Sequence, residues 1–237
     1  MPAFASLISE RIYELSTALV VDKMHLHPVE SGKLLENLYA VKTGTVNFFI
    51  YQDGPQLLCF DSGFGRQIIL RELSRLGLDP RSVTHLFLTH SDVDHAGGLD
   101  LFANAEVYLS AAEQPLVSGR QARMLGLFYN SRLRRPFHLL NDNDQLLAGA
   151  TRVRAIATPG HTPGSLSYLL NENLLFIGDA FKLTEGRVYP KRAYITMDMQ
   201  QQENSIRKLA ALENIRLACT AHNGCTTEFE SAMQSWR

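Results

Sequence analysis

The sequence lacks the features that would direct it to a nucleic acid or a membrane. Its 237 residues carry 23 Lys and Arg against 24 Asp and Glu, and the pI is near 6.7. Without a basic excess, nucleic acid is not an expected partner. No apolar stretch approaches the roughly 20 residues of a membrane helix, and residues 1–15 carry an acid and a base where a signal peptide has its apolar core. We therefore expect a cytoplasmic protein that does not enter a membrane.

Cysteine is also scarce. The three cysteines, Cys59, Cys219 and Cys225, form no C-x-x-C pair and are odd in number. This pattern predicts neither a disulfide framework nor a zinc site built from thiolates. We expect buried or incidental thiols.

The order of apolar runs predicts an α+β fold. No internal repeat, low-complexity segment or linker divides the chain, so residues 1–237 are expected to form one domain. Both halves show strand-like runs followed by helix-like periodicity, which indicates an αββα sandwich of two facing sheets with helices outside. The expected strands are 11–16, 18–24, 37–44, 46–53, 56–63, 83–89, 106–110, 151–160, 164–170, 174–180 and 215–221, and the expected helices are 66–78, 96–103, 111–138, 200–213 and 226–236.

Residues 111–138 stand out as basic, with five arginines: Arg120, Arg123, Arg132, Arg134 and Arg135. A solvated helix face is the favoured interpretation of these charges. The alternative is a lid over an anionic substrate.

The stretch LFLTHSDVDHAGG, residues 86–98, concentrates side chains that bind metals. His90, Asp92, Asp94 and His95 lie where an expected buried strand ends, and a Gly pair follows them. Loops at the carboxyl ends of strands commonly carry ligand sites. Imidazole and carboxylate without thiolate are ligands for Zn, Mn or Fe. The pattern therefore predicts a metal site rather than a polar loop whose members bond one another.

Three further segments place ligand-type residues after apolar runs. IATPGHTPGS contains His161, LLFIGDA ends near Asp179, and LACTAHNG contains His222. Each segment alone is a weak indication. Together with residues 90–95 they predict one centre at the carboxyl ends of several strands.

With these motifs, the sequence resembles the metallo-β-lactamase superfamily, whose members include β-lactamases, glyoxalase II, lactonases, phosphodiesterases and flavodiiron proteins. The resemblance runs from about residue 47 to residue 224. It implies a first metal ion held by His90, His161 and the residue at 92, a second held by Asp94, His95 and His222, and Asp179 bridging both. It also implies that Asp61 supports the site from behind the ligands.

Asp92 departs from the usual His-x-His-x-Asp-His pattern, since the family has a second histidine there. Flavodiiron proteins are the most similar at this point, because they carry a glutamate. With Asp92, Asp94, Asp179 and a hydroxide, four negative charges would face two divalent cations, which predicts a weaker Lewis acid than usual. Zinc is the favoured metal, and oxygen donation from Asp92 keeps iron and manganese open. Asp92 is expected to be a ligand; the alternative is a supporting role, with the first site weak or empty because aspartate is shorter than histidine.

The resemblance implies metal-assisted hydrolysis of a small-molecule substrate, with Asp94 orienting or deprotonating the nucleophile. A small carboxylic ester, thioester or lactone is the favoured substrate. Lys182, Tyr194 and Asn223 follow ligand positions closely enough to be candidate substrate contacts. Two alternatives stay open: an iron-dependent oxidoreductase, similar to persulfide dioxygenases or flavodiiron proteins, and a non-catalytic ligand-binding protein. The sequence leaves the oligomeric state open.

Overall fold

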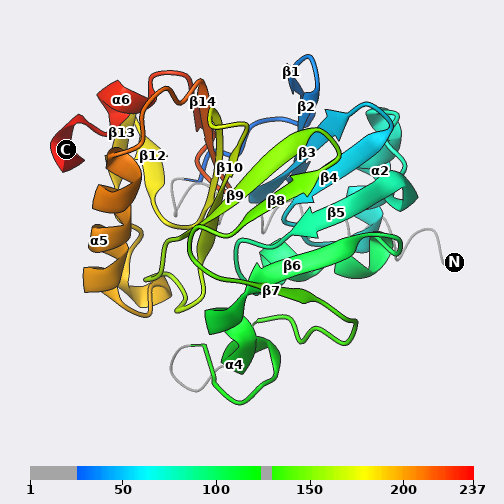
Figure 1. Cartoon of the computed structure of the whole chain (residues 1–237), viewed down its shortest axis with the longest axis horizontal. Helices are drawn as coiled ribbons and strands as arrows, with labels where there is room; N and C mark the ends of the chain where they lie inside the picture. Colours follow the sequence, from blue (N-terminus) through cyan, green and yellow to red (C-terminus); the bar gives the residue numbers. More distant parts are fainter. Residues whose placement is uncertain (1–25, 124–129) are drawn as a thin grey trace, which may run out of the picture.

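Two β-sheets pack face to face, with helices on the outer side of each (Figure 1). The structure is a computed structural model that describes residues 26–123 and 130–237. The strands expected at 11–16 and 18–24 lie outside these residues. The arrangement confirms the predicted αββα sandwich.

The first sheet has seven strands in the order of the sequence, β1 to β7. Neighbours from β1 to β4 are antiparallel, and neighbours from β4 to β7 are parallel. An Asp-Gly turn joins β3 to β4, with Asp53 paired to Gln56. The strands are β1 (Gly32–Leu35), β2 (Leu38–Thr43), β3 (Val46–Asp53), β4 (Gln56–Phe60), β5 (Val83–Phe87), β6 (Glu106–Ser110) and β7 (His138–Leu140).

The second sheet has six strands in the order β15-β14-β11-β10-β9-β8. β11 and β14 are parallel, and the other neighbours are antiparallel. β12 (Lys182–Thr184) and β13 (Arg187–Tyr189) form a separate pair. The strands of this sheet are β8 (Gln145–Ala148), β9 (Thr151–Ala157), β10 (Leu166–Leu170), β11 (Leu174–Gly178), β14 (Leu217–Thr220) and β15 (Cys225–Thr226).

Helices cover the outer faces of both sheets. α2 (Arg66–Arg75) packs on the first sheet, and α5 (Met199–Ala210) and α6 (Phe229–Ala232) pack on the second. The remaining helical turns are α3 (Val93–Ala96), α4 (Gln114–Val117), η1 (Pro80–Ser82), η2 (Leu99–Leu101), η3 (Ala111–Glu113), η4 (Ala193–Ile195) and η5 (Gln234–Trp236). Among the described residues, no helix combines the length and the apolar character needed to cross a bilayer.

Three of the helix predictions were wrong. The segment expected to form a last helix at 226–236 begins in β15 and then forms only the short α6 and η5. In place of the helix expected at 96–103, the structure has two short elements, α3 and η2, separated by Gly97 and Gly98. The long helix expected at 111–138 is limited, within its described part, to the short turns η3 and α4 before an irregular stretch. Gly119, with φ near 72°, lies just past the end of α4. A residue in this left-handed region ends a helix.

The apolar run of β3 is continuous because both of its faces are buried. Phe49 and Tyr51 point into the core between the sheets, whereas Phe48 and Ile50 point toward the outer core under the helices. Alternate side chains of a strand lie on opposite faces, so a strand inside such a layered fold needs apolar residues at every position.

The structure corrects the expectation of three unpaired thiols. Cys219 and Cys225 are joined by a disulfide, while Cys59 is free and buried. The two bonded residues are register partners across the antiparallel pair β14–β15, with Cα atoms 4.1 Å apart. Sequence spacing alone did not reveal that the chain reverses between them.

The contact between Phe60 and Phe176 predicts a large stability loss on truncation. These rings, from opposite sheets, stack with centroids 4.2 Å apart. Phe60→Ala should lower the free energy of unfolding by about 3–5 kcal/mol, because it leaves a cavity between the sheets. Urea unfolding measures this loss. The control Leu147→Ala, at a residue that is 72% exposed, should change it by about 0.5 kcal/mol or less; equal losses in both variants would contradict the packing described here.

Candidate metal centre

Strands from both sheets end at the same edge of the sandwich. β4 and β5 are parallel in the first sheet. In the second sheet β9, β11 and β14 run in one direction, since β9 and β11 are each antiparallel to β10 and β14 is parallel to β11. The predicted ligands follow these strands. Asp61 follows β4, residues 90–95 follow β5, His161 follows β9, Asp179 follows β11 and His222 follows β14.

Asp94, His95 and His222 form one cluster of ligand atoms. The Nε2 atoms of His95 and His222 are 3.4 Å apart. Asp94 Oδ2 lies 3.4 Å from His222 Nε2 and 3.8 Å from His95 Nε2. Oδ1 of Asp179 lies 3.4 Å from His222 Nε2 and 3.7 Å from His95 Nε2. Tetrahedral ligands at about 2.0–2.1 Å from a zinc ion are roughly 3.3 Å apart, so the spacing of each carboxylate oxygen from the two imidazoles is close to that of ligands of a single metal ion.

Hydrogen bonds behind this cluster orient both imidazoles. His95 donates from Nδ1 to Oδ2 of Asp61 at 2.8 Å, and His222 donates from Nδ1 to the carbonyl of Thr45 at 2.7 Å. Each Nε2 is therefore the nitrogen left to face a metal. Asp61 is itself held by the backbone N–H of Thr89 at 2.7 Å and has a left-handed φ of 63°. Such a conformation at a non-glycine residue is uncommon, and it is held here by these bonds.

His90, His161 and Asp179 form a second cluster. Oδ2 of Asp179 lies 3.4 Å from His161 Nε2. Asp92 Oδ2 lies 3.2 Å from His161 Nε2 and 3.5 Å from His90 Nε2. Within the described part of the chain, the buried Nε2 of His90 makes no hydrogen bond. The donor set of this cluster thus has the spacing of a metal site too, with Asp92 at its edge.

Two cations that the sequence did not single out lie in this second cluster. Arg123 is 2% exposed and donates from Nε and Nη2 to both carboxylate oxygens of Asp92, at 2.9 and 3.0 Å. Lys191 is 5% exposed, and its Nζ lies 2.9 Å from Oδ2 of Asp179. The expectation that Arg123 belongs to a solvated face is therefore wrong.

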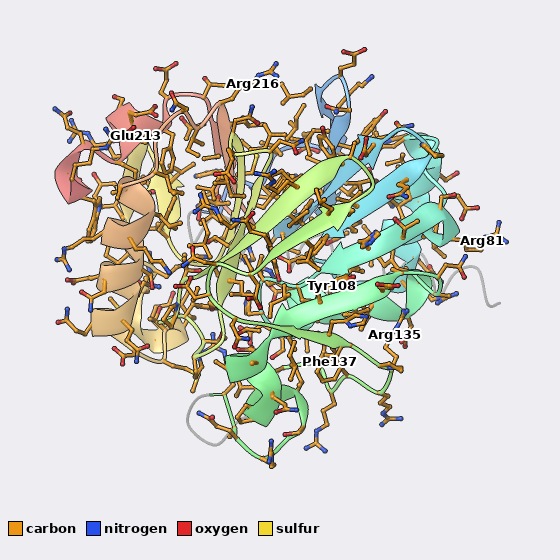
Figure 2. All side chains as sticks on the ribbon, viewed as in Figure 1. Arg81, Tyr108, Arg135, Phe137, Glu213 and Arg216 are labelled. Carbon is orange, nitrogen blue, oxygen red and sulfur yellow. A yellow bond between two sulfur atoms is a disulfide. The ribbon has the colours of Figure 1, made fainter. Side chains whose placement is uncertain are left out.

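These two cations contrast with most charged side chains, which project outward as Arg81, Glu213 and Arg216 do in Figure 2. The sequence of residues 111–138 does not distinguish Arg123 from the other four arginines. Nothing in the pattern marks the one that turns inward, and Lys191 lies in a loop without a recognisable motif.

The acidic surroundings affect the two clusters differently. Burial by itself lowers the pKa of His95, but the carboxylates of Asp61, Asp94 and Asp179 outweigh burial and raise that pKa to about 10. Burial lowers the pKa of His161 to about 4 despite the nearby carboxylates of Asp179 and Asp92. At neutral pH, His161 is therefore an uncharged ligand, while His95 must release a proton before it binds a metal.

A glycine brings the two sheets close together at the centre. Gly178 has a φ of 58°, and a Cβ at this position would lie 2.6 Å from Cβ and Oγ1 of Thr89. A side chain here would push β11 away from the loop that carries the ligands. This close approach explains why a glycine directly precedes Asp179.

Both clusters open into one cavity of about 280 Å³. Its lining includes Lys182, Tyr194 and Asn223, the three residues expected from the sequence to contact a substrate. Arg192 and Ile195 also line it. The volume is at the small end of the range for ligand pockets.

Comparison with known proteins places this geometry in a family. The family model of the metallo-β-lactamase superfamily matches residues 41–222. The chain belongs to the metallo-β-lactamase superfamily. Its fold is shared with a B3 metallo-β-lactamase described as having an active-site glutamic acid, at a TM-score of 0.69, 22% identity, and coverage of 93% of this chain and 92% of that one.

Relatives in this superfamily include proteins named as hydrolases. YobT, an uncharacterised protein of Bacillus subtilis, is 29% identical over 70% of this chain and 78% of its own length. BaeB of Bacillus velezensis, a probable polyketide biosynthesis zinc-dependent hydrolase, is 35% identical over 50% of this chain and 46% of its own. A hydroxyacylglutathione hydrolase of Serratia proteamaculans is 27% identical over 78% of this chain. The chain thus spans 65% of that hydrolase and about half of BaeB, and its fold and family are those of metallo-hydrolases.

Asp61→Asn tests the support behind His95. The neutral amide should hold the imidazole less well, so we expect metal affinity to fall about 10–100-fold. Competition with a chromogenic chelator measures this affinity. The matched control is Asp100→Asn, at an exposed position, which should leave affinity unchanged; an unchanged affinity in Asp61→Asn would show that Asp61 does not act through His95.

Metal affinity should also depend on pH. With the pKa of His95 at about 10 in the metal-free protein, a proton competes with the metal throughout the neutral range. Affinity should therefore rise about tenfold per pH unit between pH 7 and 9. Titration in zinc buffered by a chelator of known pH dependence checks this slope, and a flat profile would contradict a protonated His95.

Proposed function

We propose that this chain is a metal-dependent hydrolase that cleaves a small carboxylic ester, thioester or lactone. One observation carries the proposal: a cluster of imidazole and carboxylate ligands, oriented by hydrogen bonds behind it, opens into a cavity of about 280 Å³. The hydrolases named among the relatives support the same reaction class.

A bound divalent metal would supply an activated water and would polarise the carbonyl of the substrate. Asp94 is the ligand side chain best placed to contact that water, because 41% of it is exposed while those of His95 and His222 are 0% and 8% exposed. It would orient the nucleophile and accept its proton. The buried imidazoles would keep the donor set fixed while the substrate binds.

The cavity wall favours a substrate that carries an anionic group. Lys182 and Arg192 line the cavity without belonging to either ligand cluster, and Tyr194 and Asn223 add polar groups. A carboxylate or phosphate on the substrate would be attracted to these cations while the acyl carbon faces the ligands. The relative from Serratia, whose name describes hydrolysis of an acylated glutathione, supports a thioester among the three substrate classes.

Zinc is the metal we propose, with iron and manganese as alternatives to be tested. The zinc-dependent hydrolase among the relatives supports zinc. Asp92 would favour iron as an additional oxygen ligand, yet both of its oxygens accept hydrogen bonds from Arg123. That contact weakens the case for an iron-dependent oxidoreductase.

Chelation should abolish activity. Protein treated with a chelator should lose ester and thioester hydrolysis, and added zinc should restore it, because the metal supplies the activated water. Asp94→Asn should lower kcat by about 100-fold or more, through loss of the proton acceptor and of one ligand. A chromogenic panel of esters, thioesters and lactones measures both effects.

Gln200→Ala, at an exposed position on α5, is the matched control and should retain full activity. Iron in protein purified without chelator, together with oxygen uptake in the presence of a persulfide, would reject the hydrolase. Binding of a ligand with no turnover across the panel would instead favour a non-catalytic protein.

A further inference from the structure

Arg123 contacts two of the atoms that would bind the first metal ion. Its Nη2 lies 2.9 Å from Nε2 of His161 and 3.0 Å from Oδ2 of Asp92. The same Nη2 donates to the carbonyl of Ile195 at 3.0 Å, and Nε donates to Oδ1 of Asp92 at 2.9 Å. The guanidinium is thus fixed by acceptors from three separate segments of the chain.

A metal ion bound by these two atoms would be very close to the guanidinium. If it lay at the usual distance of about 2.0–2.1 Å from both His161 Nε2 and Asp92 Oδ2, it would be within about 4 Å of Nη2. Arginine does not lose its proton in proteins. Two cations would then share one buried edge of the site, with no water between them to screen their repulsion.

The charges around both clusters point the same way. Asp61, Asp92, Asp94 and Asp179 contribute four negative charges, and Arg123 and Lys191 contribute two positive charges, which leaves two net negative charges. One divalent ion brings this set to neutrality, whereas two would bring it to a charge of +2. A metal-poor centre therefore balances the site better than the family's dinuclear arrangement does.

We propose that Arg123, anchored by Asp92, takes the place of the first metal ion, so that the chain binds a single divalent ion at Asp94, His95 and His222, with Asp179 as the fourth ligand. The aspartate at 92 then serves to hold a built-in cation, which a histidine would not do. The inference rests on the metal dependence of the proposed function and not on its substrate class.

The number of metal ions per chain tests this inference. Zinc content is measured by mass spectrometry of the elements, after equilibration with excess zinc and removal of loosely bound ions. We expect one zinc per wild-type chain and two in Arg123→Met, which removes the cation and frees Asp92 and His161. The matched control Arg120→Met, at a neighbouring exposed arginine, should keep one. Two tightly bound ions in the wild type, or one in Arg123→Met, would overturn the proposal.

A second pair of variants locates the single ion without changing Arg123, should Arg123→Met fail to fold. His90→Ala removes a ligand only from the cluster of His90, His161 and Asp179, and we expect the protein to keep its zinc with unchanged affinity. His222→Ala removes a ligand from the cluster of Asp94, His95 and His222, and we expect it to lose at least 100-fold in affinity. If His90→Ala lost its zinc while His222→Ala kept it, the ion would lie in the cluster of His90, His161 and Asp179, and the inference would be rejected.

The outcomes also separate this inference from the proposed function. One ion per chain without hydrolysis of any ester, thioester or lactone would leave the role of Arg123 standing and reject the hydrolase. Two ions per chain together with hydrolysis would support the hydrolase and reject the proposed role of Arg123.

Discussion

The packing of Phe60 against Phe176 is the contact on which the metal centre depends. Phe60 ends β4 and Phe176 lies in β11, so their stacking at 4.2 Å joins the two sheets close to the site. Asp61 follows the first ring directly, and Asp179 lies three positions after the second. Sheet packing thereby sets the separation between a residue that orients His95 and a carboxylate shared by both ligand clusters. The candidate ligands are held in place because they follow buried strands.

The balance of charge at the site determines how many metal ions it can hold. A buried acidic site needs compensating cations, and these can be metal ions or side chains. In this chain Arg123 and Lys191 already neutralise two of the carboxylates. Lys182 and Arg192 add two further positive charges to the wall of the cavity. The aspartate at 92 is then part of one arrangement with Arg123, which accounts for its departure from the family pattern.

The candidate ligands could be located from the sequence because they follow apolar strands, and the family resemblance assigned them to two groups. Residues at the ends of apolar strands converge at one edge, and spacing within 90–95 is short enough to fix which side chains face each other. Arg123 and Lys191 reach the site from irregular loops, and their placement depends on long-range packing that no periodic pattern records. The disulfide between Cys219 and Cys225 was missed for a related reason, since a reversal at residues 221–224 brings them together.

The most direct test of the account is anomalous diffraction at the zinc absorption edge from crystals of the zinc-loaded protein. The account predicts one strong anomalous peak, surrounded by Asp94, His95, His222 and Asp179, with the guanidinium of Arg123 still bound to Asp92. A second peak of similar height between His90, Asp92 and His161, with Arg123 displaced, would contradict the built-in cation. No peak at either cluster would contradict the metal centre itself.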